Sequence, residues 1–155
     1  MVERLRRAGA ERAVVGTAAF RDIDFLDDIV SSFGARIVVA VDVKDGMIAT
    51  EGWTQTTSLP VVDAIQRLTS RGVRSFVYTD VSRDGKLTGV DLDGVCNVAD
   101  AVRGRFLYSG GIGSLDDLRA LSKLRQVNLA GVIAGKSLYE KKFTIAEGQA
   151  ALDGN

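Results

Sequence analysis

The sequence predicts an α/β protein with a mostly parallel sheet. Five short runs of β-branched and aromatic residues recur along the chain, and helix-like segments separate them. This alternation is typical of βα repeats, and the near-continuous apolarity of the runs is typical of strands buried on both faces. The even composition and the single proline favour one domain over residues 1–155. The expected strands are residues 12–16, 36–43, 75–81, 105–111 and 131–135.

The segments between these runs carry helix signals. Pro60 suits a first helical turn, Gly72 suits a C-terminal stop, and Ser114 suits an N-cap because acidic residues follow it. The longest irregular stretch, residues 44–58, is expected to be functional or to carry a small hairpin, with a strand in 47–53. The expected helices are residues 22–34, 59–72 and 114–124, with weaker patterns over 91–102 and 144–152.

Composition excludes several classes of function. Twenty basic and twenty acidic residues cancel, which argues against a nucleic-acid or membrane binder that works by bulk charge. The absence of histidine removes histidine triads, histidine metal sites and histidine acid–base chemistry. Cys96 is the single cysteine, so we expect no intrachain disulfide and a reducing, cytoplasmic location. The charged start lacks a signal-peptide pattern, and no apolar run reaches the ~18 residues of a membrane span.

Glycine and polar residues cluster where each expected strand ends. Parallel α/β proteins build their sites at this carboxyl edge, so the five clusters predict a site there. The alternative is that Gly and Asp only terminate strands and cap helices. The clusters are Gly16-Thr17, Asp42 with Lys44-Asp45-Gly46, Thr79-Asp80 with Arg83-Asp84-Gly85, Ser109-Gly110-Gly111 and Gly135-Lys136-Ser137.

The stretch "GVIAGKS" (131–137) resembles a nucleotide-binding P-loop but fails its spacing. A P-loop has four residues between its first glycine and the Gly-Lys pair, whereas three apolar residues separate Gly131 from Gly135. Gly135 and Lys136 still mark a strand-to-helix junction, where free N–H groups suit a phosphate. The turn at 109–114, "SGGIGS", would supply the other half of that grip.

A weak internal repeat suggests a second grip. Residues 14–22, "VVGTAAFRD", resemble residues 132–140, "VIAGKSLYE", so that Gly16 corresponds to Gly135. Two such grips would suit a ligand with a phosphate at each end. A chance match is the alternative.

Two carboxylates are the candidate acids. Asp42 follows a buried strand and is expected at the strand-end mouth, whereas Asp84 lies in a loop that could be a plain Asp-Gly turn. Burial can raise a carboxyl pKa enough for proton donation. Thr79 could hydrogen-bond a carboxylate or a substrate hydroxyl. Trp53 could stack on a planar ring or pack locally, and Cys96 is expected in the core.

Four segments together resemble the ProFAR isomerases of histidine biosynthesis: "VAVDVKDGMIATEGW", "VYTDVSRDGKLTG", "YSGGIGSLDDLRAL" and "GVIAGKSLYEKKFT". ProFAR is a formimino-aminoimidazole carboxamide ribonucleotide with a phosphate at each end. The resemblance covers almost the whole chain. It implies a partial (βα)8 TIM barrel that contains strands four to eight and lacks the first three. Glu51 before Gly52-Trp53 resembles the single-substrate form, since the bifunctional form tends to carry Arg there.

The resemblance also implies a reaction and roles. The family performs an Amadori rearrangement, an aldose-to-ketose isomerisation, without metal or organic cofactor. Asp42 matches the proton donor, Asp84 is a rival for that role, and Thr79 assists. The remaining matches are to substrate contacts: Gly110, Gly111, Gly135 and Lys136 to one phosphate grip, Gly16 and Thr17 to part of the other, and Trp53 to a loop cover over the substrate.

Three hypotheses follow. In the first, the chain is the C-terminal part of an isomerase, inactive alone because the family's general base lies on strand one. In the second, it is a non-catalytic phosphate-binding or self-assembling half-barrel. A doubly wound nucleotide-binding domain is third. Five strands suit it and a full barrel usually exceeds ~200 residues, but the failed P-loop spacing weakens it. We expect a bis-phosphorylated ribonucleotide as substrate, and self-association or a complementing N-terminal barrel part as partner.

Overall fold

The protein is an α/β structure on a mostly parallel sheet, as predicted. The computed structural model describes residues 2–154, and seven strands are present in that range. The strands are β1 (Ala13–Val15), β2 (Ile37–Lys44), β3 (Met47–Thr50), β4 (Gln55–Pro60), β5 (Ser75–Asp80), β6 (Arg105–Ser109) and β7 (Leu129–Ile133). The helices are α1 (Val2–Arg7), α2 (Ala18–Arg21), α3 (Ile23–Phe33), the 3-10 turn η1 (Gly34–Arg36), α4 (Val61–Ser70), α5 (Leu92–Ala101), α6 (Leu115–Lys123), α7 (Lys136–Tyr139) and α8 (Ile145–Asp153).

The parallel part of the sheet has the order β1-β2-β5-β6-β7. Strands β3 and β4 form an antiparallel hairpin beside the carboxyl end of β2, on the same edge as β1. The hairpin expected within residues 44–58 is therefore present, and β3 lies in the predicted 47–53. The strand β4 was not predicted, because its Gln-Thr-Thr-Ser sequence lacks apolar alternation.

Three predicted boundaries are wrong. The strand placed at residues 105–111 ends at Ser109, because Gly110 and Gly111 turn away with positive φ. The fifth parallel strand was placed at residues 131–135 but spans Leu129–Ile133, because Leu129 pairs with Phe106 and Gly135 is already the cap of α7. The helix placed at residues 59–72 begins only at Val61. Pro60 is its N-cap and not in its first turn, because its extended backbone still pairs with Met47 in the hairpin.

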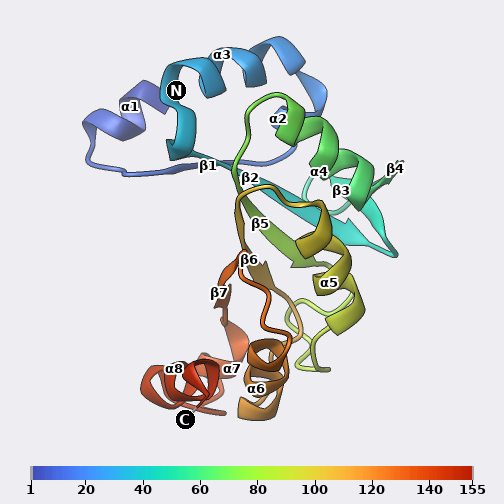
Figure 1. Cartoon of the computed structure of the whole chain (residues 1–155), viewed down its shortest axis with the longest axis vertical. Coiled ribbons are helices and arrows are strands. Elements are labelled where there is room, and N and C mark those ends of the chain that lie inside the picture. The colour runs from blue at the N-terminus through green and yellow to red at the C-terminus, as the bar shows by residue number, and fades with distance from the viewer. Residues whose placement is uncertain (1, 155) are drawn as a thin grey trace.

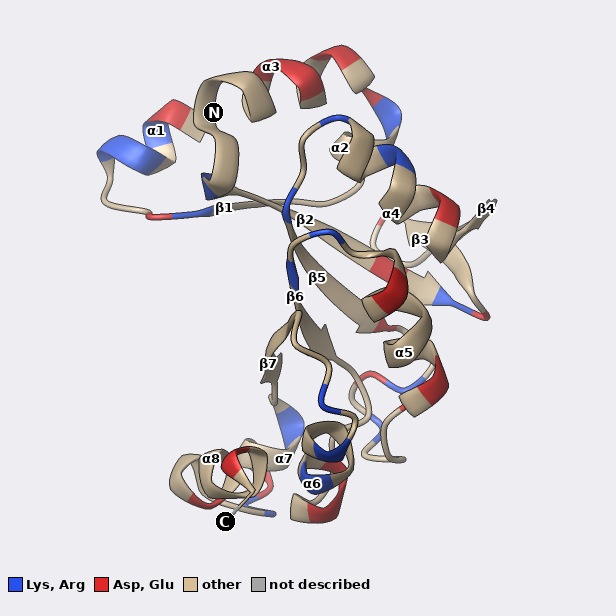
Figure 2. Ribbon diagram, in the orientation of Figure 1, with Lys and Arg blue, Asp and Glu red and all other residues tan. Residues whose placement is uncertain are grey.

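The other helices begin and end near the predicted residues. Ser114 forms a capping box with Asp117, and Asp22 caps α3 by accepting the backbone N–H of Phe25. Gly34 ends α3 with a φ of +52°. Figure 2 shows acidic and basic residues interspersed over these helices. Within residues 2–154, no helix is both long and apolar enough to cross a bilayer.

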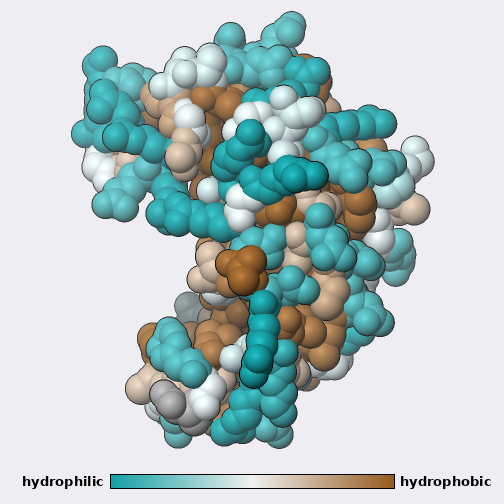
Figure 3. All heavy atoms as spheres, in the orientation of Figure 1, coloured by the Kyte–Doolittle hydropathy of each residue, from teal (hydrophilic) through white to brown (hydrophobic). Residues whose placement is uncertain are grey.

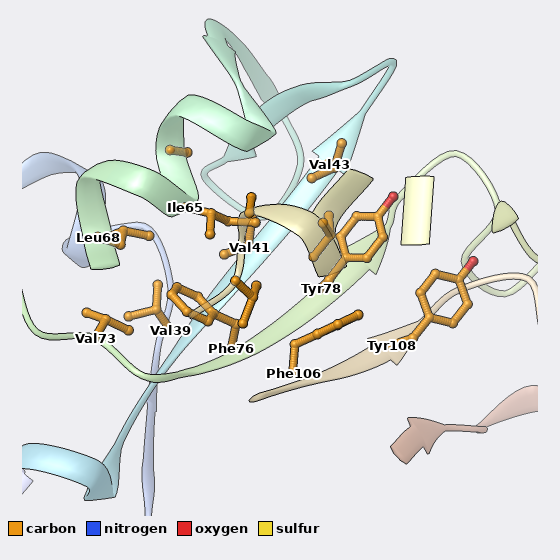
Figure 4. Packing of buried hydrophobic residues seen from close by; sticks show 14 of the residues in the cluster. Val39, Val41, Val43, Ile65, Leu68, Val73, Phe76, Tyr78, Phe106 and Tyr108 are labelled. Carbon is orange, nitrogen blue, oxygen red and sulfur yellow. The ribbon is translucent and has the colours of Figure 1, made fainter. Parts of the chain in front are cut away.

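The helices line the convex side of a curved sheet, and the concave side is open (Figure 1). The core lies between these layers, where Ile65 and Leu68 of α4 pack against Val39, Val41 and Phe76 (Figure 4). Every second strand residue points instead to the open side, which Figure 3 shows as a hollow with hydrophobic atoms on its wall. This arrangement is consistent with a partial barrel.

Candidate functional site

Five of the predicted site residues line one cavity of about 360 Å³. It lies where β6 and β7 end, and the loop that follows β5 forms its third wall. Ser109, Leu87 and Ile133 complete much of its lining. The predicted residues in it are Asp84, Gly110, Gly111, Gly135 and Lys136. The structure thus joins the two segments that sequence analysis assigned to one phosphate grip.

Gly135 and Lys136 form the β7 side of the cavity. Gly135 caps the four-residue helix α7, and its carbonyl accepts the N–H of Leu138 at 3.0 Å. A Cβ at Gly135 would meet no atom within 4 Å, so the backbone here is open to a ligand. The Lys136 ammonium lies 3.7 Å from Glu140 and stays half exposed. Backbone donors and a half-exposed ammonium at one wall suit an anion.

Gly110 and Gly111 form the β6 side. Both have positive φ, +114° and +78°, which disfavours any residue with a Cβ. A Cβ at Gly111 would lie 2.1 Å from the carbonyl oxygen of Gly89, so the turn packs directly on the preceding loop. Asp84 lies in that loop. The N–H of Lys86 donates to Arg83 at 3.0 Å, so Asp84 and Gly85 do form the turn that was the plainer interpretation.

Asp42 and Thr79 lie on the row of the sheet that leads to this cavity. Asp42 is the register partner of Thr79, and Thr79 is the partner of Ser109, which lines the cavity. With about 4.8 Å between strands, Asp42 stands roughly 10 Å from Ser109. Thr79 is 8% exposed, and Asp42 is half-buried. A carboxylate and a hydroxyl therefore share one face and one level of the sheet with the cavity.

Trp53 contacts Asp42 directly. Its indole N–H donates to Asp42 Oδ2 at 2.9 Å, while 42% of the residue stays exposed. The loop that carries Trp53 bends sharply, since Glu51, Gly52 and Trp53 all have positive φ. Both interpretations of Trp53 remain compatible with this position, because the ring packs locally and also faces solvent.

The internal repeat has a structural counterpart. The N–H of Ala19 donates to Gly16 at 2.9 Å, and the equivalent N–H of Leu138 donates to Gly135 at 3.0 Å. A four-residue helix follows in each case, and a Cβ at Gly16 would also meet nothing within 4 Å. The Thr17 hydroxyl is already engaged, because it accepts the N–H of Glu51 at 3.1 Å.

Not all predicted residues come together. Gly16 and Thr17 follow β1, four strand positions from β7, which is on the order of 20 Å along the sheet. Asp45 and Gly46 form the tight turn between β2 and β3, with φ of +52° and +77°. Cys96 was expected in the core but is half-buried in α5, where its sulfur accepts from Gln126 at 3.8 Å.

Asp80 and Arg83 belong to a strand-end cluster that the sequence singles out, but neither was given a specific role. Asp80 ends β5 and is 7% exposed, and its Oδ2 lies 3.2 Å from Arg83 Nε. Burial raises the pKa of the Asp80 carboxyl, and the charge of Asp91 adds to the rise. The available signal was a charged residue at a strand end, three positions before an arginine.

A second, larger cavity of about 680 Å³ lies between β7, α6 and α8. Its wall is mostly apolar and includes Leu118, Leu121, Val132 and Phe143. It follows the outer edge of β7, which pairs only with β6 among the described residues. It shares Ile133 and Ala134 with the smaller cavity, but neither the candidate acids nor Gly110, Gly111 and Gly135 line it, so we interpret it as unfilled packing space at a sheet edge. Within residues 2–154, no group of three Asp, Glu or Cys is placed to hold a metal ion.

The comparisons with known proteins agree with the motifs. The model of the family described as "Histidine biosynthesis protein" matches residues 1–144. A relative from Desulforudis audaxviator is 44% identical over 142 residues, which cover 92% of this chain and 54% of the relative. One from Neisseria meningitidis serogroup C is 39% identical over 145 residues, covering 94% and 59%. One from Delftia acidovorans is 36% identical over 152 residues, covering 98% and 62%.

All three relatives are named as the isomerase of 1-(5-phosphoribosyl)-5-((5-phosphoribosylamino)methylideneamino)imidazole-4-carboxamide, which is ProFAR. The resemblance predicted from the motifs is thereby confirmed. The chain spans between 54% and 62% of these relatives' length.

Proposed function

The chain belongs to the histidine biosynthesis protein family, and we propose that it forms the C-terminal part of a ProFAR isomerase. One observation supports this most strongly. The cavity formed by Gly110, Gly111, Gly135 and Lys136 contains Asp84 and lies on the same sheet edge as Asp42. An anion grip, two carboxylates and a hydroxyl are the groups that an isomerisation of a sugar phosphate needs. We place this enzyme in the cytoplasm, which the single cysteine supports.

In the proposed reaction, the cavity holds one terminal phosphate and so fixes the substrate along the strand ends. Asp42 donates a proton to the ribose ring oxygen, and the ring opens to a Schiff base. A base then removes the C2′ proton to give an enolamine, which tautomerises to the ketose. Asp42 is preferred over Asp84 as donor because Trp53 fixes its carboxyl by donating to Oδ2 and leaves Oδ1 for the substrate, whereas no side-chain hydrogen bond fixes the Asp84 carboxyl among the described residues. Thr79, next to Asp42 in register, orients the opening ring.

Gly16 and Thr17 are proposed to contact the second phosphate, and Trp53 to cover the imidazole ring. The repeated backbone hydrogen bond after Gly16 and after Gly135 supports a common role for the two turns. A span of roughly 20 Å along the sheet is suited to a ligand with phosphates at both ends. The proposed reaction uses only side-chain and backbone groups and requires no cofactor.

We further assign β1, β2, β5, β6 and β7 to strands four to eight of an eight-stranded barrel. The family places its general base on strand one, so residues 1–155 alone should turn over little ProFAR. The test is an assay of the purified chain alone and after mixing with the polypeptide that covers the unmatched part of the Desulforudis relative. We expect near-zero turnover alone and restored turnover in the mixture. Turnover of the isolated chain close to that of the whole relative would refute the assignment.

A second function, a self-assembling phosphate-binding half-barrel, is favoured by the two edges of the parallel sheet, because β1 and β7 each pair with one strand only among the described residues. Val14 on β1 is 62% exposed and Ile133 on β7 is 44% exposed, both on the open side. Unpaired, apolar edges promote association. We propose that the isolated chain self-associates through them until a complementing part is present.

Light scattering of Val14→Lys and Ile133→Lys variants tests this association. Both variants should lower the measured mass relative to the wild type. Ile23→Lys serves as the matched control, because Ile23 is 39% exposed on the outer helix α3 and should have no effect. A monomeric wild-type chain would contradict the proposal.

A further inference from the structure

Asp80, the last residue of β5, is hydrogen-bonded to the start of the loop that follows it (residues 81–91) and that contains Asp84. Its Oδ1 accepts the N–H of Ser82 at 2.9 Å, and its Oδ2 pairs with Arg83 Nε at 3.2 Å. Its backbone carbonyl also accepts the N–H groups of Arg83 at 3.2 Å and of Asp84 at 2.9 Å. Every polar atom that this residue presents to the loop is therefore engaged, in a position only 7% exposed.

Arg83 continues the connection to the far end of the loop. Its Nη1 donates to the carbonyl of Gly89 at 3.4 Å, and the N–H of Gly89 donates to Gly111 at 3.0 Å. Gly111 lines the cavity. One guanidinium thus bridges both ends of the loop, and the loop is hydrogen-bonded to the glycine turn.

The loop after β5 packs closely against the Gly110–Gly111 turn. A Cβ at Gly110 would lie 2.6 Å from the carbonyl oxygen of Asp80, and a Cβ at Gly111 would lie 3.0 Å from Arg83 Cβ. Gly110 packs on the backbone of Asp80, and Gly111 packs on the Cβ of Arg83, so a displacement of Asp80 or Arg83 should also displace the glycine turn.

We propose that the Asp80–Arg83 ion pair, which we call the brace, positions the Gly110–Gly111 turn for phosphate binding and holds the loop that carries Asp84 against this turn. This inference rests on the proposed function, in which that cavity takes a phosphate. Asp80 and Arg83 do not touch the ligand in this scheme. They act through Asp84 and the glycine turn and are positioning residues.

A purely electrostatic role for Asp80 and the brace predict opposite changes in phosphate affinity, so the two can be distinguished. Asp80 carries negative charge near an anion site, so its neutralisation should strengthen phosphate binding if charge were its only effect. The brace predicts that Asp80→Asn weakens binding, because the fixed geometry is lost. Loss of Arg83 weakens binding in both accounts and needs a charge-matched control.

The experiment titrates inorganic phosphate into the full 155-residue chain at pH 8 and follows the amide resonances of the glycine turn. Variants are Asp80→Asn, Arg83→Met, Arg83→Lys and the control Lys86→Met. Lys86 lies in the same loop, is exposed, and makes no ion pair within residues 2–154. We expect Asp80→Asn and Arg83→Met each to weaken binding about five- to tenfold, and Lys86→Met less than twofold.

Arg83→Lys keeps the charge but lacks the guanidinium fork that contacts both Asp80 and Gly89. Its phosphate affinity should therefore lie between those of the wild type and Arg83→Met. Circular dichroism and melting temperature confirm that each variant is folded. Unchanged or tighter binding by Asp80→Asn overturns the brace, as does an Arg83→Met effect no larger than that of Lys86→Met.

The phosphate assignment and the brace can be tested separately. If the wild-type chain shows no phosphate-dependent shift in the glycine turn, the phosphate assignment fails for the isolated chain. The brace is then decided by hydrogen exchange at the Gly89 N–H, which donates to Gly111. Faster exchange in Arg83→Met than in Lys86→Met supports the brace, and equal exchange overturns it.

Discussion

Trp53 donates its indole N–H to the carboxylate of Asp42 across 2.9 Å. The hydrogen bond joins the hairpin loop to the end of β2. The same loop is held a second time, because the N–H of Glu51 donates to Thr17 and its carboxylate pairs with Arg21 at 2.8 Å. The loop between β3 and β4 is therefore fixed over the strand ends by contacts with β2 and with the segment that follows β1.

The Trp53–Asp42 hydrogen bond should be visible in fluorescence, since Trp53 is the chain's single tryptophan. Asp42→Ala removes the acceptor, so the indole should become more exposed, with emission at longer wavelength and stronger acrylamide quenching. Lys44→Ala, an exposed neighbour on the same strand, should leave the spectrum unchanged. Coincident spectra of Asp42→Ala and wild type would contradict the contact.

The addition of one methyl group should weaken phosphate binding at Gly135 but lower the stability of the fold at Gly111. Gly135→Ala meets no atom within 4 Å, so the variant should fold with nearly unchanged stability while phosphate binding weakens. Gly111→Ala would place a Cβ 2.1 Å from the carbonyl of Gly89 at a φ of +78°, so it should destabilise by at least about 2 kcal/mol. Urea unfolding and phosphate titration separate the two. Equal effects on stability would refute the distinction.

The backbone framework was predictable because its signals are local. Buried parallel strands are continuous apolar runs, and Ser114 with Asp117 is a capping box readable from spacing. The cavity was predictable in part, because parallel strands bring all their carboxyl ends to one edge. The brace was not, since the contacts of Arg83 with Asp80 and Gly89 depend on how the loop folds back on β6. The strand β4 was missed because hairpin pairing, and not its own apolarity, holds it.

The capping box of α6 should contribute measurably to stability. Ser114 Oγ accepts the N–H of Asp117 at 3.3 Å, and Asp117 Oδ2 accepts the N–H of Ser114 at 2.9 Å. Ser114→Ala should lower the free energy of unfolding by about 1 kcal/mol. Ser32→Ala, at an exposed position within α3, should be neutral or slightly stabilising because alanine has the higher helix propensity. Urea midpoints at constant slope measure both, and an unaffected Ser114→Ala midpoint would argue against the cap.

The buried carboxyl of Asp80 should make stability depend on pH in a defined direction. Burial and the charge of Asp91 raise its pKa above 3.8, while the N–H of Ser82 and the charge of Arg83 oppose the rise. The facing phenols of Tyr78 and Tyr108 stay neutral, because burial raises the pKa of each. Asp80 therefore binds its proton more tightly in the folded chain than in the unfolded chain.

It follows that the stability contributed by protonated Asp80 is fully present below pH 3.8 and is lost as pH rises through the raised pKa. Asparagine at this position does not titrate. The free energy of unfolding of wild type minus that of Asp80→Asn should therefore fall as pH increases from about 3 towards 7. Urea unfolding of both proteins across this range measures the difference. A difference that rises with pH would show that the ion pair with Arg83 outweighs burial at this carboxylate.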